Sequence, residues 1–150
     1  MDIKKELKKY EKMGFDEYQL LEIREWLEKG LDAEFNIFVT PKFNELQIRE
    51  IRKGFENGLA KEYIGLYARI EYDWLQMRAI REGLKNGLTI DKVQIYAKLC
   101  FNWGQMLQIR YGLNEGLNVL VYANPNLSEG QTREIREYLT NRKEAGLDEC

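Results

Sequence analysis

The chain has 150 residues, about the size of one domain, and its 23 Lys and Arg nearly balance its 25 Asp and Glu. No apolar run approaches the roughly 20 residues that cross a bilayer, and the charged N-terminus lacks a signal peptide's apolar core. We therefore expect a cytoplasmic protein with no membrane partner. Histidine is absent, which removes the commonest general base and neutral metal ligand and disfavours an enzyme.

The N-terminal stretch DIKKELKKYEKM predicts a helix with Ile3, Leu7 and Tyr10 on one side. Its lysine-rich side is interpreted as a solvated helix face, and contact with a membrane or a nucleic acid is the alternative. In the repeat organisation that follows, this helix takes the place of a second helix with no first helix before it.

From residue 15 onward, one sequence unit occurs five times, at spacings of 26 to 29 residues. Each copy has a polar residue that can cap a helix, a Gln three positions later, an Ile-Arg pair and a closing Gly-Leu. The Gln can complete a capping box, so its recurrence requires no catalytic role. The predicted long helices span residues 17–29, 45–57, 74–86, 103–115 and 129–143.

A shorter element follows the first four Gly-Leu pairs and ends in an aromatic residue. We expect about two helical turns before Tyr96, with Thr89 as the cap, and one turn before Tyr122, where Pro125 prevents extension. The aromatic series is interpreted as core: Tyr10, Phe38, Tyr67, Tyr96 and Tyr122. The sequence thus predicts an all-α fold, a short α-solenoid of five helix-turn-helix repeats with an N-terminal half-repeat helix, in one domain over residues 1–150.

The two cysteines are too few for a disulfide framework and lack metal-ligand spacing, so we expect no metal and no cofactor. Cys100 is expected to pack beside the apolar Phe101, and Cys150 to be an exposed thiol.

One recurrent residue that could carry function is the Arg of the Ile-Arg pair, which lies beside the apolar stripe of its helix and faces a neighbouring long helix. Its copies are Arg24, Arg52, Arg81, Arg110 and Arg136. The three middle copies also have Gly at the tenth position after the cap, namely Gly54, Gly83 and Gly112, where Gly costs about 1 kcal/mol relative to Ala. We interpret these glycines as sites of close approach by the adjacent long helix, with each Arg laying its stem across one and pairing with carboxylates or helix-end carbonyls. Contact with a partner is the alternative.

A less regular feature is the position just after the cap, which is Trp in the third and fourth copies and Glu in the others. Trp and Arg are enriched in interface hot spots, so the two tryptophans and the nearby cations form a candidate partner-binding patch. Packing against a neighbouring repeat is the alternative. The patch residues are Trp74, Arg78, Arg81, Lys85, Trp103 and Arg110.

The motif apolar-[DNS]-x-x-Q-[LIM]-x-x-I-R-x-G-[LF]-x-x-G-L, with Y-A-x-P in the connection, resembles a group of tandem helical repeats. These repeats, of roughly 29 residues, occur in uncharacterised proteins of phages and mobile elements of Gram-positive gut bacteria. The resemblance covers nearly the whole chain. It implies a mobile-element origin, in which small helical proteins often bind and block a host factor, and it implies no catalytic residue.

The sequence therefore favours a non-enzymatic protein–protein interaction module. A sharper alternative is an anti-defence inhibitor, similar to an anti-CRISPR protein, that binds and blocks a bacterial nuclease. A further alternative is a nucleic-acid-binding helical repeat protein that uses the Arg series, which the acidic pI near 5.4 disfavours. The oligomeric state stays open.

Overall fold

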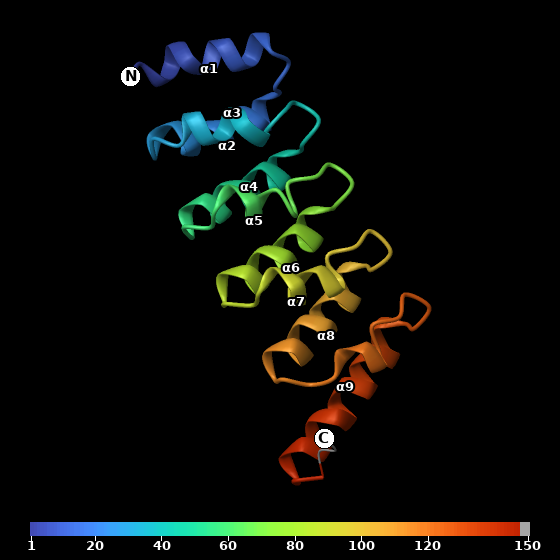
Figure 1. Ribbon diagram of the computed structural model, residues 1–150. Helices are drawn as coiled ribbons and strands as arrows, with labels where there is room; N and C mark the ends of the chain where they lie inside the picture. Colours follow the sequence, from blue (N-terminus) through green and yellow to red (C-terminus); the bar gives the residue numbers. More distant parts are fainter. Residues whose placement is uncertain (148–150) are drawn as a thin grey trace. The chain divides into compact units, whose positions relative to one another are not determined.

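The protein is built from helices that alternate between long and short along the chain (Figure 1). The computed structural model describes residues 1–147, and over this part it has nine α-helices, one 3-10 helix and no strand. The long helices are α2 (Glu17–Glu28), α4 (Glu45–Glu56), α6 (Trp74–Lys85), α8 (Trp103–Asn114) and α9 (Glu129–Glu144). The short elements are α1 (Ile3–Lys12), α3 (Asp32–Phe38), α5 (Lys61–Ile64), α7 (Ile90–Tyr96) and η1 (Val119–Val121). The all-α prediction is confirmed.

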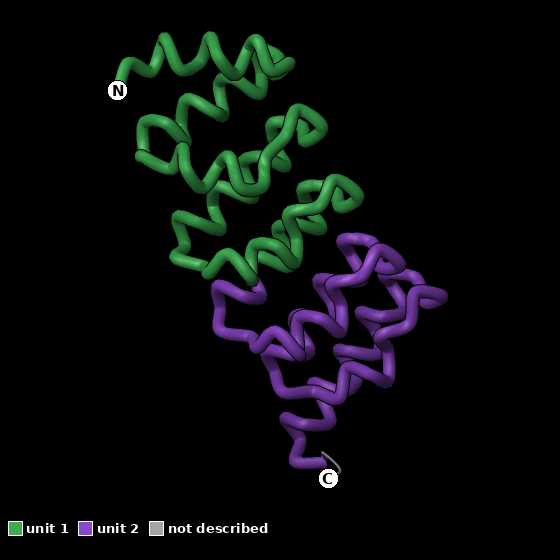
Figure 2. Tube along the Cα trace, turned by 45° about the horizontal axis from the view of Figure 1, so that its top comes forward, with its two compact units in different colours: residues 1–81 green, residues 82–150 purple. Residues whose placement is uncertain are grey.

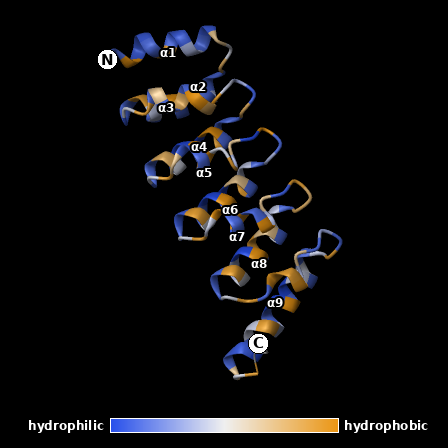
Figure 3. Ribbon diagram, in the orientation of Figure 1, coloured by the Kyte–Doolittle hydropathy of each residue, from blue (hydrophilic) through white to orange (hydrophobic). Residues whose placement is uncertain are grey.

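The chain divides into two compact units, residues 1–81 and residues 82–150, with the boundary inside α6 (Figure 2). In unit 1, α2 packs against α1, α3 and α4, and α5 packs against α4. In unit 2, α8 packs against α7, η1 and α9. Apolar and polar residues alternate along the helices (Figure 3), so each helix turns an apolar side inward. None of the helices in the described part is both long and apolar enough to span a membrane.

Each long helix begins with the predicted capping box. In α4, Asn44 Oδ1 accepts from the backbone N–H of Gln47, and Gln47 Oε1 accepts from the backbone N–H of Asn44, both at 2.9 Å. The same exchange starts α2, α6, α8 and α9. At the other end, the closing glycines have positive φ, for example 76° at Gly58 and 72° at Gly146, as the left-handed position after a helix requires.

The recurrent Gln has a second role that the capping argument did not predict. Gln47 Nε2 donates to the carbonyl oxygens of Ile70, at 3.3 Å, and Tyr72, at 2.6 Å. Gln19 donates in the same way to the connection that leads into α4, and Gln105 to the connection that leads into α9. One amide therefore links the start of a long helix to the connection that precedes the next long helix.

The mid-helix glycines accommodate tyrosine hydroxyls. In unit 1, Tyr67 Oη donates to the carbonyl oxygen of Glu50 at 3.0 Å, and a Cβ on Gly54 would overlap that hydroxyl. In unit 2, Tyr122 and Tyr96 are placed likewise against Gly112 and Gly83, and Tyr122 Oη donates to the carbonyl oxygen of Gln108 at 2.7 Å. The prediction that these glycines admit an adjacent long helix and an Arg stem was wrong. They admit a tyrosine from a short element.

The first long helix has Trp26 in place of this glycine. The short element that follows it ends in Phe38, which has no hydroxyl to accommodate. Trp26 is fully buried, and its ring packs edge-on against Phe35, with centroids 5.2 Å apart, and against Phe55, at 5.8 Å. The indole therefore fills with aromatic contacts the position that glycine holds in the three middle copies.

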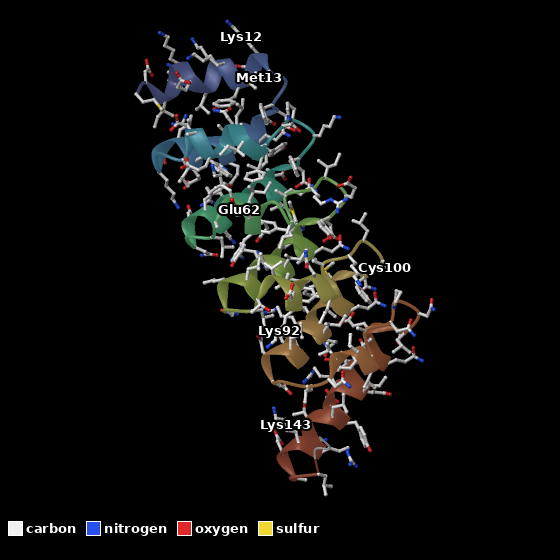
Figure 4. All side chains as sticks on the ribbon, in the orientation of Figure 1. Lys12, Met13, Glu62, Lys92, Cys100 and Lys143 are labelled. Atoms are coloured by element: carbon white, nitrogen blue, oxygen red, sulfur yellow. The ribbon has the colours of Figure 1, made fainter. Side chains whose placement is uncertain are left out.

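The prediction that Cys100 packs in the core was wrong as well. Cys100 is exposed, in the connection after α7 (Figure 4), whereas the next residue, Phe101, is buried. Because Phe101 turns inward, the residue before it turns outward. The predicted exposed thiol, Cys150, lies outside the described residues.

Candidate protein-binding surfaces

The recurrent Arg holds together neighbouring long helices through buried carboxylates. In unit 1, Arg52 Nε of α4 donates to Glu22 Oε1 of α2 at 2.6 Å, and Arg49 Nε donates to Glu22 Oε2 at 3.2 Å. Glu22 is buried, so both of its oxygens depend on these two guanidinium groups. Two arginines three residues apart thus clamp one glutamate of the preceding long helix.

The same clamp recurs one helix further on in unit 1. Arg81 Nε donates to Glu50 Oε2 at 2.9 Å, and Arg78 Nε donates to Glu50 Oε1 at 3.2 Å. Arg81 also donates through Nη1 to Asn57 Oδ1 at 2.9 Å. Removing one partner of such a buried pair typically costs 3–5 kcal/mol, on the order of a large core truncation.

Unit 2 contains a weaker version of this arrangement. Arg136 Nε donates to Gln108 Oε1 at 2.7 Å, and its Nη1 lies 3.3 Å from Glu115 Oε1. Arg110 pairs through Nη2 with Glu82 Oε2 at 3.2 Å. Its buried Nε is one of two buried side-chain atoms in the described part without a hydrogen-bond partner, the other being Trp26 Nε1.

These contacts explain most of the Arg series as structure. The interpretation that the Arg side chains pair with carboxylates is confirmed, except that Gln108 is a neutral acceptor. Two patch residues, Arg81 and Arg110, are only 5% and 6% exposed. A partner surface and a nucleic-acid surface both require accessible groups, so neither can be built on these two arginines.

The other four patch residues are more accessible. Trp74 is partly buried, and the Arg78 guanidinium lies over its ring, 4.7 Å from the centroid. Both belong to unit 1. Lys85 and Trp103 are exposed and belong to unit 2. The predicted patch is therefore divided between the two units, and each half is a separate candidate.

A groove between α2 and α4 contains residues that the sequence analysis missed. Its lining includes Tyr18, Leu21 and Leu46, with Arg24 and Arg49 alongside. Tyr18 is 59% exposed and Leu21 is 66% exposed, both high values for apolar side chains. The Arg24 guanidinium is half exposed and reaches Glu28 only at 4.0 Å, so it lacks the buried partner of the later copies.

We define the long-helix face of unit 1 as Tyr18, Leu21, Leu46, Arg49, Trp74 and Arg78. These side chains come from α2, α4 and α6. Arg49 connects α4 to α2 through Glu22, and Arg78 connects α6 to α4 through Glu50, so the three helices present one surface.

A sequence signal for this face existed. Tyr18 and Leu21 stand two and five positions after the cap, on the side of the helix opposite the apolar stripe at 100° per residue. An apolar residue on that side cannot serve the core.

Comparison with protein-family models, curated proteins and solved structures finds no match for the chain. Among residues 1–147, no three metal-ligating side chains converge. The structure thus defines an all-α protein whose recurrent polar residues maintain the fold and whose long helices carry some of the exposed apolar side chains, Tyr18 and Leu21 among them.

Proposed function

We propose that the protein is a non-enzymatic protein–protein interaction module that binds its partner through the long-helix face of unit 1. We also propose that the five sequence repeats stack as a short α-solenoid, an architecture that commonly binds proteins along one side. The observation that carries the functional proposal is the exposure of Tyr18 and Leu21 beside Arg49, because the fold assigns these two apolar side chains no internal role.

The energetics of this face suit a binding site. Burying an exposed Leu or a comparable side chain contributes about 1.5–3 kcal/mol, which is the magnitude of an interface hot spot. Arg49 and Arg78 are already anchored by Glu22 and Glu50, so their guanidinium groups lose less freedom when a partner binds. Blocking a bacterial defence nuclease is a specific form of this proposal, in which the partner is that nuclease.

The test compares two double variants that remove equal amounts of exposed apolar surface. Tyr18→Ser with Leu21→Ser alters the long-helix face, whereas Tyr138→Ser with Leu120→Ser alters side chains that are 59% and 70% exposed elsewhere. Each protein is used to capture partners from a lysate of the organism that encodes it, and the affinity of any stoichiometric partner is then measured. We expect the first variant to bind at least roughly 30-fold more weakly than wild type and the second to bind as wild type does. Equal affinities for both variants would refute the site.

A separate arm concerns the tryptophans. Trp74→Ala tests the same face, and Trp103→Ala tests the contribution of unit 2. A partner that is lost only with Trp103→Ala would move the binding site to unit 2.

A further inference from the structure

Helix α1 presents a face made only of lysine. At 100° per residue, its lysines fall within roughly 140° of arc, opposite the side formed by Ile3, Leu7 and Tyr10. All are exposed: Lys4, Lys5, Lys8, Lys9 and Lys12. Lys9 pairs with Glu6 Oε1 at 2.8 Å, and the other four have no ion pair with any described residue. Figure 3 shows α1 as predominantly hydrophilic, and in Figure 4 the labelled Lys12 points away from α2.

The apolar side of α1 faces the rest of unit 1, with Ile3 and Leu7 partly buried. Tyr10 is buried, and its ring contacts those of Phe15 and Phe35, with centroids 5.8 Å and 5.1 Å apart. A helix that binds a membrane surface inserts its apolar side between the lipids. Because this side packs against the rest of unit 1, the face of the helix that is left for an external ligand is mainly charged.

Solubility does not require this arrangement. The outer face of a terminal element in a helical repeat protein needs to be polar, but carboxylates solubilise a surface at least as well as lysines do. The exposed side of α9 mixes signs, as with Arg133, Glu134 and Glu137. Residues 1–12, which include α1 and its cap, contain five Lys and three acidic residues, although the whole chain has a net charge of −2. This end of the chain therefore has a local positive charge of +2.

We propose that the lysine face of α1 binds the phosphate backbone of a nucleic-acid duplex without reading its sequence. Lysine is a point charge with no preferred geometry, which suits phosphate contact and does not distinguish bases. No aromatic residue interrupts the lysine arc, so the stacking platform of a single-strand binder is missing from it. Lys4, Lys8 and Lys12 follow each other at about 6 Å along the helix axis, close to twice the 3.4 Å axial spacing of phosphates on one strand. This binding is independent of the long-helix face.

The experiment measures binding of the full chain to a fluorescent duplex DNA of about 20 base pairs by anisotropy, over salt from about 50 to 200 mM. If all five lysines neutralise phosphates, log K falls against log salt with a slope of about −4.5, which is about a 500-fold loss over that range. The variant Lys4→Gln, Lys8→Gln, Lys12→Gln should reduce the steepness of the slope by about 2.7, and the corresponding three Lys→Arg changes should leave it intact.

A matched control removes the same charge elsewhere. Lys61, Lys92 and Lys98 are exposed and have no ion pair with described residues, and Lys92 is labelled in Figure 4. The triple Lys→Gln change at these positions should keep the wild-type slope. Circular dichroism confirms that both triple variants stay folded. Equal losses in the two variants, or an absence of duplex binding by wild type at about 50 mM salt, would overturn the proposal.

Discussion

The contact between Gly54 and Tyr67 makes a sharp energetic prediction. Replacing a mid-helix Gly by Ala ordinarily stabilises a helix by about 1 kcal/mol. Here the added methyl group would overlap Tyr67 Oη and approach Ile64 Cγ1 to 3.2 Å, and such overpacking costs about 1–3 kcal/mol. After the gain of about 1 kcal/mol from helix propensity is subtracted, we expect Gly54→Ala to lower the free energy of unfolding by up to about 2 kcal/mol, in place of the usual stabilisation.

The hydroxyl can be removed independently. Tyr67→Phe deletes the hydrogen bond to the Glu50 carbonyl oxygen. The cost should be only about 1 kcal/mol, because that carbonyl lies inside a helix and keeps its backbone hydrogen bond. In the Tyr67→Phe background, the closest obstacle to the methyl group is gone. The double variant should then be about as stable as wild type. The coupling free energy between Gly54→Ala and Tyr67→Phe is therefore at least about 1 kcal/mol in magnitude.

Urea unfolding of the four proteins measures this cycle, provided that the m-values agree. Gly65→Ala serves as a control, because a Cβ there meets only ordinary contacts, the nearest being the Lys61 carbonyl oxygen at 3.4 Å, and φ is −59°. A stabilising effect of Gly54→Ala, or an equal effect in both backgrounds, would refute the reasoning.

Three further predictions concern the polar groups. Gln47→Glu should lower the free energy of unfolding in urea by about 2–4 kcal/mol, since it would turn a carboxylate toward two backbone carbonyl oxygens. Gln131→Glu, at an exposed position, is the control and should change that free energy by less than about 0.5 kcal/mol. Equal effects of the two variants would contradict this reasoning. Arg81→Met should cost about 3 kcal/mol because it removes one of the two guanidinium groups that pair with the buried Glu50, and Arg110→Met should cost about 1 kcal/mol because its Nε has no partner. A larger loss for Arg110→Met, seen as the lower urea midpoint, would disprove the assignment. Burial raises the phenol pKa of four tyrosines, and it does so most strongly for three of them, Tyr67, Tyr96 and Tyr122. The stability that depends on these three neutral phenols is retained below pH ~10 and falls above it, by up to about 4 kcal/mol per pH unit. Tyrosinate absorbance should appear together with loss of helical circular dichroism, and ionisation of all tyrosines in a folded protein would show the reasoning to be wrong.

The helices could be predicted from the sequence because the chemistry that starts and ends them is local. A cap such as Asn44, its Gln three residues later and the closing Gly58 act within a few residues of one another. Their geometry follows from helix dimensions alone. The second role of Gln47 was not predicted because its carbonyl partners lie 23 and 25 residues away.

The role of the mid-helix glycines could not be derived from helix geometry, because their contacts come from a different element. A signal was nevertheless present in the sequence. Gly at the tenth position after the cap accompanies a following Tyr, and Trp26 accompanies Phe38. Comparing the mid-helix position with the aromatic residue that ends the next short element would have indicated that Gly occurs where that residue carries a hydroxyl group.

The exposure of Cys100 was also open to a comparison of repeats. The corresponding residues in three other connections are Lys42, Glu71 and Asn126, all polar and all exposed. The neighbour of a buried aromatic was assumed to share its environment, but Cys100 lies in a turn on the surface, where polar residues stand in the other connections.

The candidate site could be predicted only in part, for a reason that belongs to repeated folds. A residue that recurs in every copy is most simply explained by the packing of one helix on the next, which every copy requires. The clamps around Glu22 and Glu50 show this for arginine. Arg81 and Arg110 were chosen for the partner patch because of their residue type, and the fold uses both internally. Among the residues that distinguish one copy from another, Trp26 is buried, whereas Leu21 stands on the solvent side of its long helix, where the core makes no demand on it. Leu21 occupies the position that Arg49 and Arg78 hold in the clamps, and Tyr18 takes no part in them. Because neither side chain contributes to the core or to a clamp, a partner is the simplest account of their exposure.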